Sequence, residues 1–203
     1  MKRFFALLIL AAAFAAIPLR GTEPCDPAPD GQLRPDPDDA WSPIQVGFLP
    51  GIPGYTATGN VRGLKTGWPI VDGNGYVRGV EFSLFYSGTA AVTGLQTAFF
   101  GCGSCELDGI QFSPGICQAR NLNGLQVGLM NFGGDITGFQ AGVICNVNDD
   151  VAGYQTALVN KAASVNGLQV GIINLADSGS IQIGLINCIR DSAIPFFPLI
   201  NFW

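Results

Sequence analysis

The most reactive side chains of this chain are its six cysteines, and two of them, Cys102 and Cys105, form a CxxC motif. A CxxC motif holds zinc, exchanges electrons or closes a local disulfide. A zinc site needs further ligands, and the chain has no histidine and no second CxxC. A thioredoxin-like redox site needs a βαβ context, which the surrounding sequence lacks. We therefore expect a structural disulfide within the set Cys102, Cys105 and Cys117.

The other residue types offer little chemistry. The absence of histidine removes the commonest general base and the commonest zinc ligand. The acidic pairs at 38–39 and 149–150 lie in leader or turn segments, which favours solvated carboxylates over a calcium site. No GxxxxGK[ST] or GxGxxG motif opens a helix, so the 28 glycines do not indicate a phosphate loop. The sequence predicts no catalytic, cofactor-binding or metal-binding residue, and hence a protein that is not an enzyme.

Charge argues against nucleic acid as a partner. The formal net charge is −5, and the six basic residues that follow Trp41 are scattered along the chain. Binding to phosphate backbones requires clustered Lys and Arg. Charged residues make up only 12% of the chain, whereas about a quarter is usual for a globular domain. Insertion into a membrane would explain this depletion.

The N-terminal segment has the pattern of an export signal. Lys2 and Arg3 precede an apolar run from Phe4 to Ala16 that ends in small residues. This run is too short for a transmembrane helix. We predict a signal peptide over residues 1–21 and a disordered, Pro-rich acidic leader over 22–40, which holds six acidic residues and one arginine. Residues 41–203 then form the repeat domain.

One pattern recurs through this domain: Gly, apolar, Gln, any residue, small, apolar, any residue, Asn. Clear copies are GLQVGLMN at 124–131, GYQTALVN at 153–160 and GLQVGIIN at 167–174. From Gly79 onward the copies start 13 to 15 residues apart, at positions 79, 94, 109, 124, 138, 153, 167 and 180. Apolar residues alternate within each copy and helical periodicity is missing, so each copy is predicted to be a strand followed by a turn.

Two architectures accommodate such a repeat. In a β-solenoid each unit is one coil, and its Gly and Asn residues stack at corners. In an up-and-down barrel each unit is one strand, and successive strands run antiparallel. Around Gln126 and Gln169 the unit reads nearly the same in both directions. An antiparallel sheet of duplicated strands requires this symmetry, because every second copy is inverted, whereas a solenoid does not require it. We therefore predict an all-β, up-and-down antiparallel barrel of about 10–12 strands, with a β-solenoid as the alternative.

The two faces of the predicted strands differ in kind. One face is aliphatic and aromatic, and it carries no charge at its central positions in any copy. The other face has a central polar residue flanked by Gly or Ala, and it accepts charge at Lys65 and Glu81, which should be neighbours on adjacent strands. In a barrel this polar face lines the lumen, and in a soluble sheet or solenoid it faces water. The candidate polar-face residues are Gln45, Lys65, Glu81, Gln96, Gln111, Gln126, Gln140, Gln155, Gln169 and Gln182.

An apolar outer band with a polar interior is typical of outer-membrane barrels. The chain ends in Phe202 and Trp203, and a last strand that ends in an aromatic residue is common in such barrels. Pro195 and Pro198 would restrict this last segment to an edge or irregular strand. The aliphatic band therefore predicts outer-membrane lipid as a partner.

The repeat together with the terminal segment PFFPLINFW resembles the bacterial exported "surface repeat" proteins of the leptospiral type, over residues 43–203. The resemblance implies an exported protein of the bacterial outer membrane or cell surface, and it supplies no activity. We expect a non-enzymatic protein with a structural or surface-interaction role. The alternatives are a soluble or surface-attached solenoid that binds a partner along one face, and a narrow outer-membrane channel lined by Gln.

Overall fold

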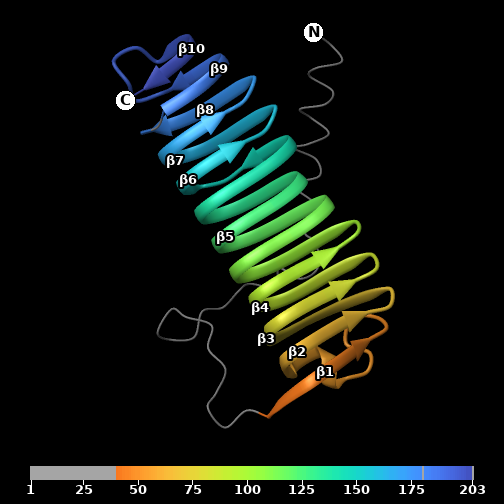
Figure 1. Cartoon of the computed structure of the whole chain (residues 1–203). Coiled ribbons are helices and arrows are strands. Elements are labelled where there is room, and N and C mark those ends of the chain that lie inside the picture. Colours follow the sequence, from red (N-terminus) through yellow and green to blue (C-terminus); the bar gives the residue numbers. More distant parts are fainter. Residues whose placement is uncertain (1–39, 180, 203) are drawn as a thin grey trace.

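The computed structural model describes residues 40–179 and 181–202 (Figure 1). The predicted signal peptide and residues 22–39 of the predicted leader lie outside this part of the chain. The described residues form ten strands and one short helix, in the order β1 (Trp41–Gly47), α2 (Tyr55–Thr58), β2 (Asn60–Gly67), β3 (Ile70–Ser83), β4 (Tyr86–Ala98), β5 (Gly101–Val147), β6 (Asp150–Thr156), β7 (Val159–Val170), β8 (Ile173–Ser178), β9 (Ile181–Ile189) and β10 (Phe196–Phe202).

The strands stack as the coils of a β-solenoid of about ten turns, as Figure 1 shows. Strands β1 to β9 pair in parallel, and β10 closes the stack by pairing antiparallel with β9. The β5 strand runs through several coils without interruption. The predicted all-β class and the repeat are confirmed, whereas the predicted antiparallel barrel is wrong and the solenoid alternative is correct.

The pairing register explains why the barrel prediction failed. Equivalent residues of successive copies lie side by side, so that Gly79 pairs with Gly94 and Gln155 pairs with Gln169. An antiparallel arrangement would bring identical residues together at the strand centres alone, whereas parallel stacking aligns every position of the unit. The reversal symmetry of the unit therefore does not require antiparallel neighbours. It reflects two apolar outward positions placed on either side of one inward amide.

A column of glycines holds successive coils close together. Eight glycines from Gly63 to Gly167 have φ between +127° and +154°, a range that L residues rarely adopt. A Cβ atom at Gly153 would collide with the carbonyl oxygen of Gly138, and each neighbouring glycine meets its predecessor in the same way. The glycine of the repeat is therefore required both by its backbone angle and by the closeness of the next coil.

The interior of the solenoid holds both apolar and amide side chains. An apolar column two residues before the glycines includes Val77, Val92, Leu107, Leu122 and Ile136, all at most 3% exposed. The amides of the repeat fill the rest of the interior, as described below. The outward positions carry many of the large apolar side chains. This arrangement reverses that of an ordinary soluble sheet, in which the apolar face forms the core.

We expect Gly153→Ala to lower the free energy of unfolding by at least about 1–3 kcal/mol, because the alanine would be strained and would collide with backbone. Urea denaturation followed by circular dichroism measures the change. Gly54→Ala is the matched control, since Gly54 has φ −54° and nothing within 4 Å of the added Cβ. Equal effects of the two substitutions would contradict the role assigned to the glycine column.

Candidate functional site

All ten predicted polar-face residues lie inside the solenoid, in one column that we call the Gln column. Gln45 is 3% exposed and the other nine are 0% exposed. These side chains therefore face neither water nor an open lumen, and they fill the space between the walls of the coil. The predicted neighbourhood of Lys65 and Glu81 is confirmed, because the two residues are register partners on β2 and β3.

Hydrogen bonds connect the Gln column from coil to coil. From Gln111 to Gln182, each Nε2 donates to the Oε1 of the preceding glutamine over 2.6–2.9 Å. Such a ladder forms when identical amides stack at the spacing of adjacent strands, as in cross-β structures. Each amide thus provides both a donor and an acceptor within the core, and the cost of burying it is offset.

A second column of amides, the Asn column, also runs through the interior. It consists of Asn131, Asn146, Asn160, Asn174 and Asn187, which are 0% exposed. From Asn131 to Asn174 each Nδ2 donates to the Oδ1 of the following asparagine over 2.8–2.9 Å. These bonds point toward the C-terminal end, whereas those of the Gln column point toward the N-terminal end. The side-chain dipoles of the two columns therefore oppose each other.

The predicted disulfide set divides into two kinds of cysteine. Cys102 and Cys117 are free and buried, so neither bonds to Cys105, which is disulfide-bonded. Both free thiols donate to carbonyls ten residues ahead, Cys102 to Phe112 over 3.5 Å and Cys117 to Val127 over 3.2 Å. Asn131 donates to Ala141 with the same step, so these cysteines occupy asparagine positions. Burial raises the pKa of Cys102 well above its usual value and that of Cys117 to about 12, which makes both poor nucleophiles.

In the two coils that follow Gln45, charged groups replace the amides of the Gln column. The Lys65 ammonium donates to Thr89 Oγ1 over 2.8 Å, and Ser87 Oγ donates to Glu81 Oε1 over 2.6 Å. Glu81 Oε2 is buried without a hydrogen-bond partner. Burial lowers the pKa of Lys65, against the opposing charges of Glu81 and Asp72. Lys65 and Glu81 thus occupy two successive register positions of the Gln column, between Gln45 and Gln96.

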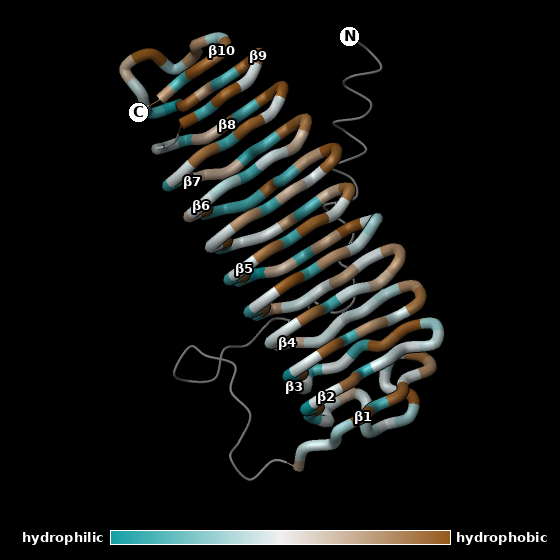
Figure 2. Tube along the Cα trace, viewed as in Figure 1, coloured by the Kyte–Doolittle hydropathy of each residue, from teal (hydrophilic) through white to brown (hydrophobic). Residues whose placement is uncertain are grey.

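On the outside, one edge of the solenoid is apolar at almost every coil. The bend that follows each Gln strand carries a pair of consecutive residues, and most of them are large and hydrophobic. We call this row the apolar ridge, and Figure 2 shows it as the brown edge. Its pairs are Phe48-Leu49, Trp68-Pro69, Leu84-Phe85, Phe99-Phe100, Pro114-Gly115, Leu129-Met130, Val143-Ile144, Leu158-Val159, Ile172-Ile173 and Leu185-Ile186.

The outward face of the Gln strands continues the ridge, and we call it the apolar wall. It consists of the positions one and three residues after the repeat glycine, such as Ile110, Phe112 and Phe139. Several large wall residues, such as Leu64, Ile110 and Phe112, are 40–45% exposed, and Phe99, Val143 and Leu185 of the ridge are 59–64% exposed. Phe139 stacks on Tyr154 of the next coil, with ring centroids 4.9 Å apart.

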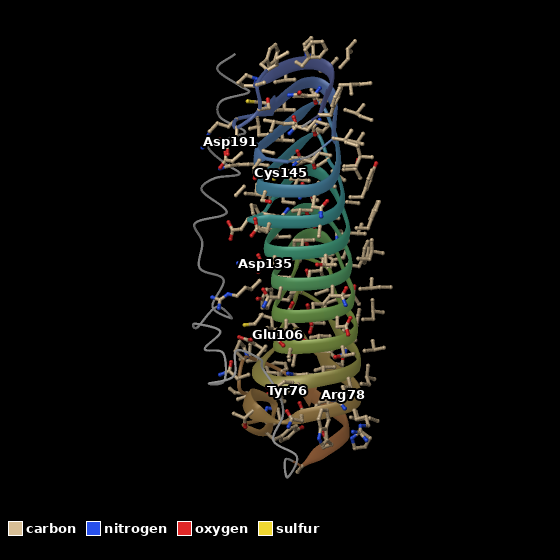
Figure 3. The ribbon with its side chains drawn as sticks, turned by 90° about the vertical axis from the view of Figure 1, so that its left-hand side faces the viewer. Tyr76, Arg78, Glu106, Asp135, Cys145 and Asp191 are labelled. Carbon is tan, nitrogen blue, oxygen red and sulfur yellow. The ribbon has the colours of Figure 1, made fainter. Side chains whose placement is uncertain are left out.

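Acidic residues gather at the opposite edge. Asp135, Asp149 and Asp150 lie in or beside the bends there, and Asp177 pairs with Arg190 at 3.0 Å. We call this side the polar edge, and Figure 3 looks onto it, with Glu106 and Asp135 among the labelled residues. The solenoid is therefore amphipathic across its width, with an apolar ridge at one edge and carboxylates at the other.

Comparison with known proteins assigns no relative: no family model, no curated protein and no solved structure matches this chain.

Across residues 40–179 and 181–202, no group of three or more side chains lies close enough together to share a metal ion. Over the same residues, no helix has the length and hydropathy needed to cross a membrane.

Sequence reasoning identified the aliphatic face but missed the ridge. The signal was present, because two consecutive apolar residues recur after each small residue of the repeat. A strict two-residue alternation would place one member of each pair inside. The structure leaves neither member buried because the chain bends between them. Hydrophobicity alone does not distinguish this bend from a strand.

We expect Gln169→Leu to lower the free energy of unfolding by about 1–3 kcal/mol, because Gln155 Oε1 would lose its donor inside the core. Asn166→Leu is the matched control, since it replaces an exposed amide of the same strand and should change stability by less than about 0.5 kcal/mol. Urea denaturation compares the two. A tolerated Gln169→Leu would mean that the buried ladder contributes nothing to stability.

We also expect a pH dependence from Lys65. Its pKa is lowered from 10.5 on folding, so between the two pKa values the unfolded chain binds more protons and stability rises with pH. The difference in unfolding free energy between wild type and Lys65→Met should therefore increase as pH rises toward 10.5. Lys161→Met, at an exposed position of β7, controls for the loss of one positive charge. A difference that decreases with pH would contradict this assignment.

Proposed function

We propose that this protein is a non-enzymatic surface-interaction module whose binding surface is the apolar ridge with the adjoining apolar wall. The observation that carries the proposal is the exposure of large apolar side chains at the same bend of successive coils. Loop residues of soluble proteins are normally polar, because they face water. A row of apolar bends is therefore evidence for a covered surface.

The size of this surface supports the proposal. About ten coils at about 4.8 Å each make a surface about 45–50 Å long, and the ridge with the wall is about 15 Å wide. The resulting area of roughly 700 Å² exceeds the apolar patch of most soluble monomers. It is close to the roughly 800 Å² that one partner contributes to a standard interface.

The amide ladders support the proposal in another way. Because each coil is bonded to the next through Gln and Asn side chains, the outer residues are held in fixed rows before any partner binds. Preorganised surfaces lose little conformational entropy on binding. The interior is thus suited to hold a rigid binding surface, and this role needs no catalytic group.

Export and a cell-surface location are part of the proposal, and they rest on the N-terminal signal pattern and the resemblance to the surface repeat proteins. A Gln-lined channel is not part of it. The Gln side chains are 0–3% exposed, and those from Gln96 to Gln182 are hydrogen-bonded to one another, so that they fill the interior in which a pore would have to run.

The test is retention of the exported protein on the bacterial cell envelope. A ridge variant carries Val143→Asp, Leu158→Asp and Ile172→Asp, and we expect at least about tenfold more of it in the soluble fraction than of wild type. The matched control places the same three charges at exposed positions of the same coils, as Thr137→Asp, Ala152→Asp and Asn166→Asp.

Circular dichroism of both triple variants checks that the solenoid is retained. The control should stay with the envelope fraction, like wild type. Equal retention of the ridge variant and wild type would show that the ridge is not the interaction surface.

A further inference from the structure

We propose that the apolar ridge inserts into the acyl-chain layer of one lipid leaflet, with the solenoid axis lying in the plane of the membrane. This inference rests on the proposed function, because it names the partner of the same surface. It is carried by the backbone hydrogen bonding of the ridge, by its shape and by the distribution of charge around the solenoid.

The N–H groups of the ridge bends are already hydrogen-bonded along the stack. Phe100 N–H donates to the carbonyl of Phe85 over 3.0 Å, and Ile172 N–H donates to that of Leu158 over 3.0 Å. The same coil-to-coil bonds recur at Leu84, Phe99, Leu158 and Ile186. In ordinary loops the N–H groups of the bends are hydrogen-bonded to water, so such loops do not enter lipid. The N–H groups named above bond to the neighbouring coil, so they do not need water.

Side chains of the Asn column donate hydrogen bonds to backbone carbonyl groups near the same bends. Asn146 Nδ2 donates to the carbonyl of Thr156 over 3.0 Å, and Asn160 Nδ2 donates to that of Val170 over 2.9 Å. Both carbonyls lie two residues before a ridge pair. The Asn column therefore lies directly beneath the ridge and satisfies backbone acceptors from inside. Because a buried amide bonds these carbonyls from inside, they do not need water on the outer, apolar side of the bend.

The shape of the surface favours lipid over a second copy of this chain. The ridge is a convex edge formed by successive bends, and its side chains at Phe99, Val143 and Leu185 are 59–64% exposed. A protein partner would need a complementary groove, and the wall and the ridge of a second copy offer none that the described residues reveal. Acyl chains are fluid and adapt to a protruding edge, as they do around amphipathic helices in the interface.

The distribution of charged residues determines how the solenoid is oriented on the membrane. The bend positions of the ridge hold no charged residue in any coil, whereas the carboxylates of Asp135, Asp149 and Asp150 lie at the polar edge. Insertion of the ridge therefore keeps these charges in water. The chain has a net charge of −5, so it gains nothing from anionic headgroups. A zwitterionic phosphatidylcholine surface, which has no net charge, should be sufficient for binding.

The experiment is co-sedimentation of the full exported protein with phosphatidylcholine vesicles. We expect wild type to bind, with a partition coefficient that changes less than about twofold between 0.05 and 0.5 M salt, because apolar insertion is not screened. The triple variant Val143→Asp, Leu158→Asp, Ile172→Asp should bind at least about tenfold more weakly. The control variant Thr137→Asp, Ala152→Asp, Asn166→Asp, with the same three charges at exposed positions outside the ridge, should bind like wild type.

Tryptophan emission locates the contact. Trp68 belongs to the ridge, so vesicles should shift the emission to the blue, and Trp68→Phe should remove most of that shift while binding persists. Failure of wild type to bind vesicles would overturn the inference. Ridge-dependent retention on the envelope in the same preparation would leave the proposed function standing and would point to a protein partner, and a dimer that loses its association in the ridge variant would identify that partner as a second copy.

Discussion

The structure depends on the in-register stacking of identical amide side chains inside a parallel coil. Each glutamine of the Gln column from Gln111 to Gln169 both donates and accepts along the axis, so a coil without neighbours would bury unpaired amides. This requirement makes the stack cooperative in the way that repeat proteins are, because each unit is stabilised mainly by its neighbours. It also demands a constant distance between coils, which the glycine column maintains through its close approach to the preceding backbone.

The arrangement of the outer surface follows from the filling of the interior. A coil of 13 to 15 residues encloses too little space for both amide columns and a full set of large apolar side chains. The apolar residues next to each glutamine therefore point outward, along the wall and the ridge. In most proteins an apolar exterior would bring aggregation. Here the ridge and the wall lie away from the polar edge, whose charged residues keep that edge hydrated.

Several particular features could be read from the sequence. The all-β class, the repeat and the adjacency of Lys65 to Glu81 follow from spacing, because equivalent positions of neighbouring units must meet. The role of Cys102 and Cys117 could not be read, since a cysteine that replaces a column asparagine looks like any other cysteine until the column is seen. The ridge was missed because a bend between two apolar residues has no distinct residue signature.

The sequence by itself determined the unit, its period and the separation of one amide face from one apolar face. These properties depend on residue types and on the two-residue alternation of a strand, which are local. Only the tertiary structure decided whether neighbouring units run parallel or antiparallel, and at which bend both members of an apolar pair stay unburied. The strand direction depends on interactions between residues about 15 positions apart. Each amide of a Gln ladder both donates and accepts a hydrogen bond when successive amides point the same way. A unit that reads alike in both directions does not reveal this preference.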